Sequence, residues 1–125
     1  MLAKDFHWKK MEQCDGYTET VFLGEEAKAC YAGLDIVEKG VEIPLHAHSE
    51  GEQIWIILEG KGRMRVGDVT ENVHGGMFVY VPRNTEHSVK NIGEGRFQYI
   101  YVSTWPFDCN KLNLRRAPTS KENNK

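Results

Sequence analysis

Two histidines separated by a single residue, His46 and His48, stand at the end of an apolar run that follows Gly40. In a β-strand, side chains at positions i and i+2 point to the same face, so the two imidazoles can converge on one point. Neutral imidazole is a common ligand of divalent transition metals. The spacing therefore predicts a metal-binding pair at the end of a strand.

A second apolar run, residues 53–58, starts five positions after His48. If this run turns back alongside the first, it brings either Glu52 or Gln53 close to the histidines. The alternatives differ in charge, because a carboxylate leaves a divalent ion with one uncompensated positive charge, whereas an amide leaves two. A site with Gln53 should therefore bind an anionic oxygen donor more avidly.

Strand alternation links this choice to the faces of the second run. If Gln53 faces inward, Trp55 and Ile57 do so as well, and both become candidate walls of a substrate pocket. The opposite face then carries a row of large apolar side chains: Ile54, Ile56 and Leu58. Such a face needs a cover, and we expect a homodimer to supply it.

A third histidine, His87, can complete the ligand set. It follows a turn-forming stretch, residues 82–86, that is preceded by the apolar residues 77–81. Three imidazoles and one oxygen ligand with open positions suit a divalent ion of Fe, Mn, Ni, Co or Zn. The remaining histidines, His7 and His74, have no partner at ligand spacing and are interpreted as surface residues.

These two segments together resemble the cupin superfamily, whose motifs are G-x5-H-x-H-x3–4-E-x6-G and G-x5-P-x-G-x2-H-x3-N. The motif positions in this chain are Gly40, His46, His48, Gln53 and Gly60, then Gly76, Pro82, Asn84, His87 and Asn91. Gln53 replaces the more common Glu, and the six-residue gap to Gly60 favours it over Glu52. Asn84 replaces Gly, which is a mild change because Asn tolerates positive φ.

The resemblance implies a single-domain jelly-roll β-barrel of two antiparallel sheets, and the strand pattern agrees with it. Short runs with alternating or β-branched character recur between Gly-rich turns, with no long helical pattern. We expect an N-terminal arm at 1–16, the barrel at 17–107 and a polar tail at 108–125. The expected strands are 18–23, 29–37, 41–48, 53–58, 62–66, 77–81, 87–90 and 97–102.

Composition limits the classes of partner. The formal net charge is −2, and cationic residues concentrate at 110–125, so the barrel is not expected to bind nucleic acid. No apolar run approaches the roughly 18 residues that a membrane span needs, and a cytoplasmic protein is expected. The three cysteines lack paired spacing and predict neither a disulfide framework nor a zinc knuckle.

Cupins share their fold across many activities, so the resemblance leaves the function open. Some small cupins with a Gln ligand linearise unsaturated uronates with an acidic residue on the last barrel strand. That position is Ile100 here, a candidate pocket residue without an acid, which argues against this reaction. Arg63 and Arg65 are expected to point outward, away from any substrate, because Met64 and Val66 form the apolar face.

Three functions remain. The first is an isomerase, lyase or decarboxylase that uses the metal as a Lewis acid on a small carboxylate, hydroxy-keto or sugar-derived metabolite. The second is an Fe(II) dioxygenase, and the third is a non-catalytic module that binds a metal or a sugar. No catalytic residue is assigned by the sequence.

Overall fold

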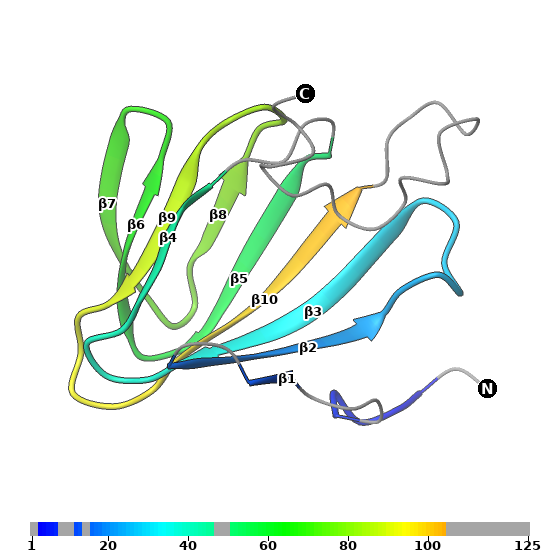
Figure 1. Cartoon of the computed structure of the whole chain (residues 1–125), viewed down its shortest axis with the longest axis horizontal. Helices are drawn as coiled ribbons and strands as arrows, with labels where there is room; N and C mark the ends of the chain where they lie inside the picture. The colour runs from blue at the N-terminus through cyan, green and yellow to red at the C-terminus, as the bar shows by residue number, and fades with distance from the viewer. Residues whose placement is uncertain (1–2, 8–11, 14–15, 47–50, 105–125) are drawn as a thin grey trace.

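The computed structural model describes residues 3–7, 12–13, 16–46 and 51–104, and its regular elements there are all β-strands (Figure 1). The ten strands are β1 (Glu12–Gln13), β2 (Tyr17–Leu23), β3 (Cys30–Val37), β4 (Glu42–His46), β5 (Gln53–Glu59), β6 (Lys61–Val66), β7 (Val69–His74), β8 (Phe78–Val81), β9 (His87–Asn91) and β10 (Phe97–Thr104). Within these ranges, no helix could span a membrane.

The strands form two antiparallel sheets, which confirms the all-β jelly-roll prediction. One sheet has six strands in the order β1-β2-β3-β10-β5-β8, and the other has four in the order β4-β9-β6-β7. Strands distant in sequence become neighbours in this arrangement, and β10 pairs with both β3 and β5. The C-terminal part of the barrel therefore lies at the centre of the larger sheet.

Each run that was predicted as a strand coincides with an observed strand, but β7 was missed. Only Val73 is buried in this strand, so its sequence shows no clear alternation of apolar and polar residues. It is an edge strand that pairs with β6 after the turn at Gly67 and Asp68. An edge position with one face in solvent accepts such polar residues.

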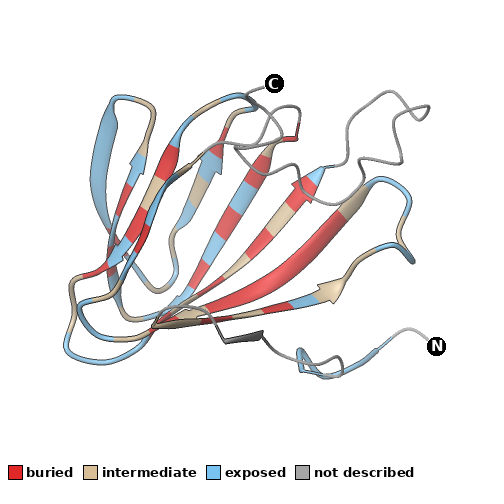
Figure 2. Ribbon diagram, viewed as in Figure 1, coloured by how far each residue is buried: buried red, intermediate tan, exposed pale blue. Residues whose placement is uncertain are grey.

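The core lies between the sheets and is built from alternate residues of the strands. Figure 2 shows β5 as alternating buried and exposed bands. The inward face of β5 carries Gln53, Trp55 and Ile57, as expected if Gln53 faces inward. The outward residues are 42–45% exposed: Ile54, Ile56 and Leu58. On β6, both arginines are exposed while Met64 is buried, so the outward orientation of Arg63 and Arg65 is confirmed.

The proposed division into an N-terminal arm, a barrel and a tail stays a prediction. β1 pairs with β2 at the edge of the six-stranded sheet, which is where an N-terminal arm would lie. The proposed tail, residues 108–125, lies outside the described residues.

Candidate functional site

His46 and His87 lie side by side on the neighbouring strands β4 and β9. They are register partners, and their ring centroids are 4.3 Å apart. Between Ile43 and His46 the register shifts by one residue, so three steps along β4 match only two along β9. This β-bulge reverses the phase of the strand and puts His46 on the same inward face as Ile43.

Backbone carbonyls fix the orientation of both rings. Nδ1 of His46 lies 2.8 Å from the Pro44 carbonyl oxygen, and Nδ1 of His87 lies 2.9 Å from that of Thr85. A carbonyl oxygen can only accept, so each Nδ1 is the donor and the neutral ring carries its lone pair on Nε2. Histidines that ligate metals are commonly held in this way.

A turn with an unusual backbone leads to His87. Asn84 has φ of 58°, and it is the one non-glycine residue with positive φ in the part of the chain that the structure describes. Asn adopts this conformation more readily than most residues, in agreement with the tolerance expected from its residue type. The turn returns the chain to the four-stranded sheet, where His87 is 2% exposed.

Gln53 and Glu52 point to opposite sides of β5. Gln53 is buried in the cavity, where its Oε1 accepts a hydrogen bond of 2.6 Å from Nε1 of Trp55. Indole N–H can only donate, which identifies the facing amide atom as oxygen. Glu52 instead accepts a hydrogen bond from the hydroxyl of the exposed Tyr80, also at 2.6 Å. The cavity thus presents an amide rather than the neighbouring carboxylate.

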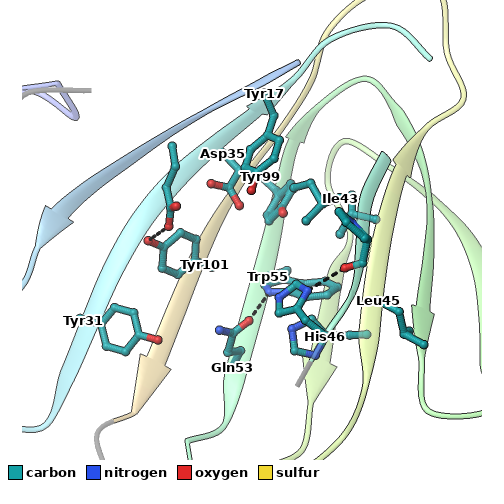
Figure 3. Close-up of a pocket in the computed structure, with 14 residues that line it drawn as sticks. Tyr17, Tyr31, Asp35, Ile43, Leu45, His46, Gln53, Trp55, Tyr99 and Tyr101 are labelled. Carbon is teal, nitrogen blue, oxygen red and sulfur yellow. Dashed lines mark hydrogen bonds between the residues drawn. The ribbon is translucent and has the colours of Figure 1, made fainter. Parts of the chain in front are cut away.

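The two histidines and Gln53 line one cavity of about 460 Å³ between the sheets, drawn in Figure 3. This volume lies within the range of small-molecule sites. Trp55 forms part of its wall, and its ring centroid lies 5.3 Å from that of His87 and 5.7 Å from that of Tyr99. The lining residues are Tyr17, Glu19, Tyr31, Asp35, Ile43, Pro44, Leu45, His46, Gln53, Trp55, His87, Val89, Tyr99 and Tyr101.

Two predicted pocket residues do not line this cavity. Ile100 lies on the opposite face of β10, because the alternation of that strand buries Tyr99 and Tyr101 instead. Ile57 faces inward but belongs to the hydrophobic core, and its register partner Tyr99, with Trp55, lines the cavity instead. Of the three residues that the sequence predicts for a substrate pocket, Trp55 thus lines this cavity, and the assignment of a substrate to it stays a prediction.

Two carboxyl groups line the cavity, and neither was identified from the sequence. Glu19 on β2 is the register partner of Asp35 on β3, which in turn is the register partner of Tyr99 on β10. The three residues form a row across the six-stranded sheet, and Figure 3 shows Asp35 beside Tyr99. On β3, Asp35 alternates in phase with Tyr31 and other inward residues, and this alternation could have identified it as a cavity residue.

Hydrogen bonds with tyrosines hold this row. The Tyr101 hydroxyl donates to Glu19 at 2.7 Å, and Tyr99 is hydrogen-bonded to Asp35. Gly33, the register partner of Tyr101, gives that ring its space, because a Cβ at Gly33 would collide with the phenol. The acidic and phenolic groups are therefore positioned by the strands themselves.

Burial changes the acidity of these groups. Desolvation raises the pKa of Asp35 well above its usual range, the charge of Glu19 adds to the effect, and the hydrogen bond from Tyr99 opposes it. Desolvation likewise raises the pKa of both Tyr99 and Tyr101. These shifts favour the neutral form of each group, which reduces the repulsion expected between carboxylates on facing strand positions.

The donor set fits a divalent transition metal. Two imidazoles with Nε2 lone pairs and an amide oxygen share one cavity, and the amide oxygen has a second lone pair besides the one that Trp55 engages. His48, the remaining predicted ligand, lies outside the described residues. In the ranges that are described, no group of three or more His, Cys, Asp or Glu residues could hold a metal ion.

Sequence comparison finds a family match and relatives. The family model for the Cupin domain matches residues 33–103. An uncharacterised protein of Methanocaldococcus jannaschii, MJ1618, is 35% identical over 72 residues, which cover 58% of this chain and 58% of that protein. The match thus spans less than two thirds of the relative.

Solved structures show the same fold. The cupin domain of Cnp3 from Schizosaccharomyces pombe superimposes with a TM-score of 0.75 at 22% identity, covering 91% of this chain and 80% of that one. The polyketide cyclase RemF from Streptomyces resistomycificus gives 0.73 at 20% identity, covering 83% of this chain and 79% of that one. At these identities the likeness concerns the fold alone.

Proposed function

The chain belongs to the cupin family, and we propose that it is a metal-dependent enzyme acting on a small oxygenated metabolite. The metabolite is a carboxylate, a hydroxy-keto compound or a sugar derivative, and the reaction is of the isomerase, lyase or decarboxylase type. His46, His48, Gln53 and His87 would hold one divalent transition metal ion. Cupins commonly bind a metal, which supports this proposal.

The observation that carries the proposal is the pair of oriented imidazoles. Because the Pro44 and Thr85 carbonyls engage Nδ1 of His46 and His87, both rings carry their lone pair on Nε2, the atom that would bind the metal. Gln53 adds a neutral oxygen in the same cavity. A site preorganised in this way loses little conformational entropy when a metal binds.

When bound, the metal would supply Lewis-acid polarisation of a ligand oxygen. The residues that line the cavity determine which ligand groups it favours. Gln53 contributes no charge, so the histidine end favours an anionic oxygen such as a carboxylate. The aromatic wall of Trp55, Tyr99 and Tyr101 favours a flat or partly apolar ligand body and limits access of water.

An enzyme is compatible with the comparisons, since the same fold carries a polyketide cyclase in RemF. The Fe(II) dioxygenase and the binding module are the alternatives that the following experiment separates. The protein is purified without added metal, its metal is identified by mass spectrometry, and oxalate binding is measured by calorimetry with and without that metal. Zinc, nickel, cobalt or manganese together with metal-dependent oxalate binding supports the proposal.

Other results contradict it. Oxygen-sensitive iron, with oxygen consumption on an enol substrate, would assign the dioxygenase function. Oxalate binding that is unchanged after removal of the metal would place the ligand site elsewhere. A protein that binds metal but turns over no member of a panel of simple carboxylates, hydroxy-keto acids and sugar derivatives would be a binding module.

We also propose that the protein forms a homodimer through the outer face of β5 and β8. This face carries Ile54, Ile56 and Leu58 together with Phe78 and Tyr80, which are 71% and 49% exposed. β5 and β8 are paired, and β8 is the edge strand of the six-stranded sheet. A contiguous apolar patch at a sheet edge is typical of an interface between subunits.

A further inference from the structure

One oxygen atom in the cavity has a hydrogen-bonding requirement that its neighbours leave unmet. Asp35 is 8% exposed and lines the cavity, but within the described ranges its Oδ1 has no hydrogen-bond partner. The carboxyl already has a hydrogen bond with the Tyr99 hydroxyl. A buried polar atom without a partner costs about 1–3 kcal/mol, so its retention needs an explanation.

The surroundings of Asp35 indicate which chemical group would satisfy Oδ1. Glu19, its cross-strand partner, is a charged residue that acts on Asp35, and it already accepts a hydrogen bond from Tyr101. A negatively charged ligand group would be repelled by this wall. A hydroxyl can both donate and accept, so it matches the carboxyl in either protonation state.

We propose that Asp35 Oδ1 is a hydrogen-bonding subsite for a hydroxyl group of the ligand. The cavity then has two chemically different ends: an imidazole and amide end at His46, Gln53 and His87, and a carboxyl and phenol end at Asp35 and Tyr99. A hydroxylated carboxylate suits both, with its carboxylate at the first end and a hydroxyl at the second. The choice of carboxylate rests on the proposed function, whereas the hydroxyl subsite rests on Asp35 alone.

Burial supports the assignment of a hydroxyl rather than an ammonium group. Desolvation, with the charge of Glu19, raises the pKa of Asp35 and so favours its neutral form. To pair with an ammonium group the carboxyl would have to ionise against this desolvation, whereas a hydroxyl can form a hydrogen bond with it in either protonation state. The ligand group is therefore expected to be uncharged at this end.

The experiment compares two probes that differ in their hydroxyl groups. Gluconate and hexanoate share a six-carbon chain and a carboxylate, and their binding to the full-length, Zn²⁺-loaded protein is measured by calorimetry. The variants are Asp35→Leu, which removes the polar group, and Asp35→Asn, which keeps a group that donates and accepts. Asp68→Asn makes the same amide substitution at an exposed position and serves as the control.

We expect the wild type to bind gluconate more tightly than hexanoate. Asp35→Leu should weaken gluconate binding by about tenfold or more, the value of a hydrogen bond, without weakening hexanoate binding. Asp35→Asn should retain most of the preference, and Asp68→Asn all of it. If Asp35→Leu does not fold, an unchanged preference in Asp35→Asn together with a lost preference in Asp35→Ala still supports the subsite.

The subsite is wrong if the wild type binds the two probes equally, because Oδ1 is then satisfied by water. It is also wrong if Asp35→Leu and Asp35→Ala keep the preference, or if aminohexanoate binds more tightly than gluconate. Failure of the proposed function looks different. In that case, metal-free protein and His46→Ala bind both probes as tightly as the Zn²⁺-loaded wild type, while the gluconate preference still depends on Asp35.

Discussion

His46 and His87 are register partners across β4 and β9, and their rings approach each other edge to face, with 66° between the planes. The bulge in β4 makes this pairing possible, because a regular strand would direct His46 away from Ile43 and out of the cavity. The carbonyl contacts at both Nδ1 atoms then leave little freedom to the rings. The proposed metal site depends on this pair.

Removal of either ring should abolish stoichiometric metal binding. We expect His46→Ala and His87→Ala to reduce bound metal from about one ion per chain to near zero, because a loss of one imidazole leaves too few ligands. Metal content of the purified variants, measured by mass spectrometry, tests this. His74→Ala, which removes an exposed histidine, should keep the metal. Full occupancy in both cavity variants would refute the site assignment.

The charge at position 53 should control the affinity for metal. Gln53→Glu keeps an oxygen that can accept the Trp55 hydrogen bond but adds a negative charge to the ligand set. We expect metal affinity to rise by about tenfold or more, since affinity follows ligand charge, and oxalate binding to weaken. Competition with a chelator measures the first effect, and calorimetry the second.

The neighbouring residue supplies the matched control for this prediction. Glu52→Gln changes the charge by the same amount in the opposite direction, but on the side of β5 where Tyr80 lies. Metal affinity should therefore stay close to that of the wild type. If Glu52→Gln weakened metal binding strongly and Gln53→Glu had no effect, the carboxylate rather than the amide would be the ligand.

The sequence predicted those parts of the site that depend on local spacing. Gln53 and Trp55 could be assigned to one inward face because strand alternation is local, and the positive φ of Asn84 follows from residue type. Ile100 was chosen as a pocket residue from the family pattern, whereas the alternation of β10 buries Tyr99 and Tyr101. The alternation of residues along β10 indicates more directly which of its side chains face the cavity.

The acidic row could not have been assembled from the sequence. Glu19, Asp35 and Tyr99 meet only because β2, β3 and β10 are neighbours in one sheet and because their registers align these positions. Neither the strand order nor the register follows from local propensity, since both depend on how the sheets close around the core. β7 was missed for a related reason, because an edge strand with one buried residue has no clear hydrophobic period.

A charge on the exposed apolar face should dissociate the proposed dimer. Ile56→Glu places a carboxylate among Ile54, Leu58 and Phe78, and burial of that charge against a second copy would cost several kcal/mol. Light scattering at micromolar concentration should show two chains for the wild type and one for the variant. Thr70→Glu, an exposed position on β7, should remain a dimer. A monomeric wild type would exclude this interface.

The stability of the fold should depend on pH through Asp35. Desolvation and the charge of Glu19 raise the pKa of Asp35 in the folded state, and its other titratable neighbours, Tyr99 and Tyr101, have raised pKa values and stay neutral. An acid with a raised folded-state pKa binds more protons when folded. Its ionisation therefore lowers the free energy of unfolding once the pH rises above the pKa of the unfolded state, about 3.9. This loss grows until the pH reaches the pKa of the folded state.

Asp35→Asn removes this titration and keeps the shape of the side chain. The melting temperature of the variant should exceed that of the wild type at neutral pH, and the difference should shrink or reverse near pH 3, about one unit below the unfolded pKa, where Asp35 is largely protonated in both states. Thermal melts of both metal-free proteins at the two pH values test this, and Asp68→Asn should show no such trend. A difference that is equal at both pH values, or larger at the acidic one, would mean that Asp35 titrates normally in the cavity.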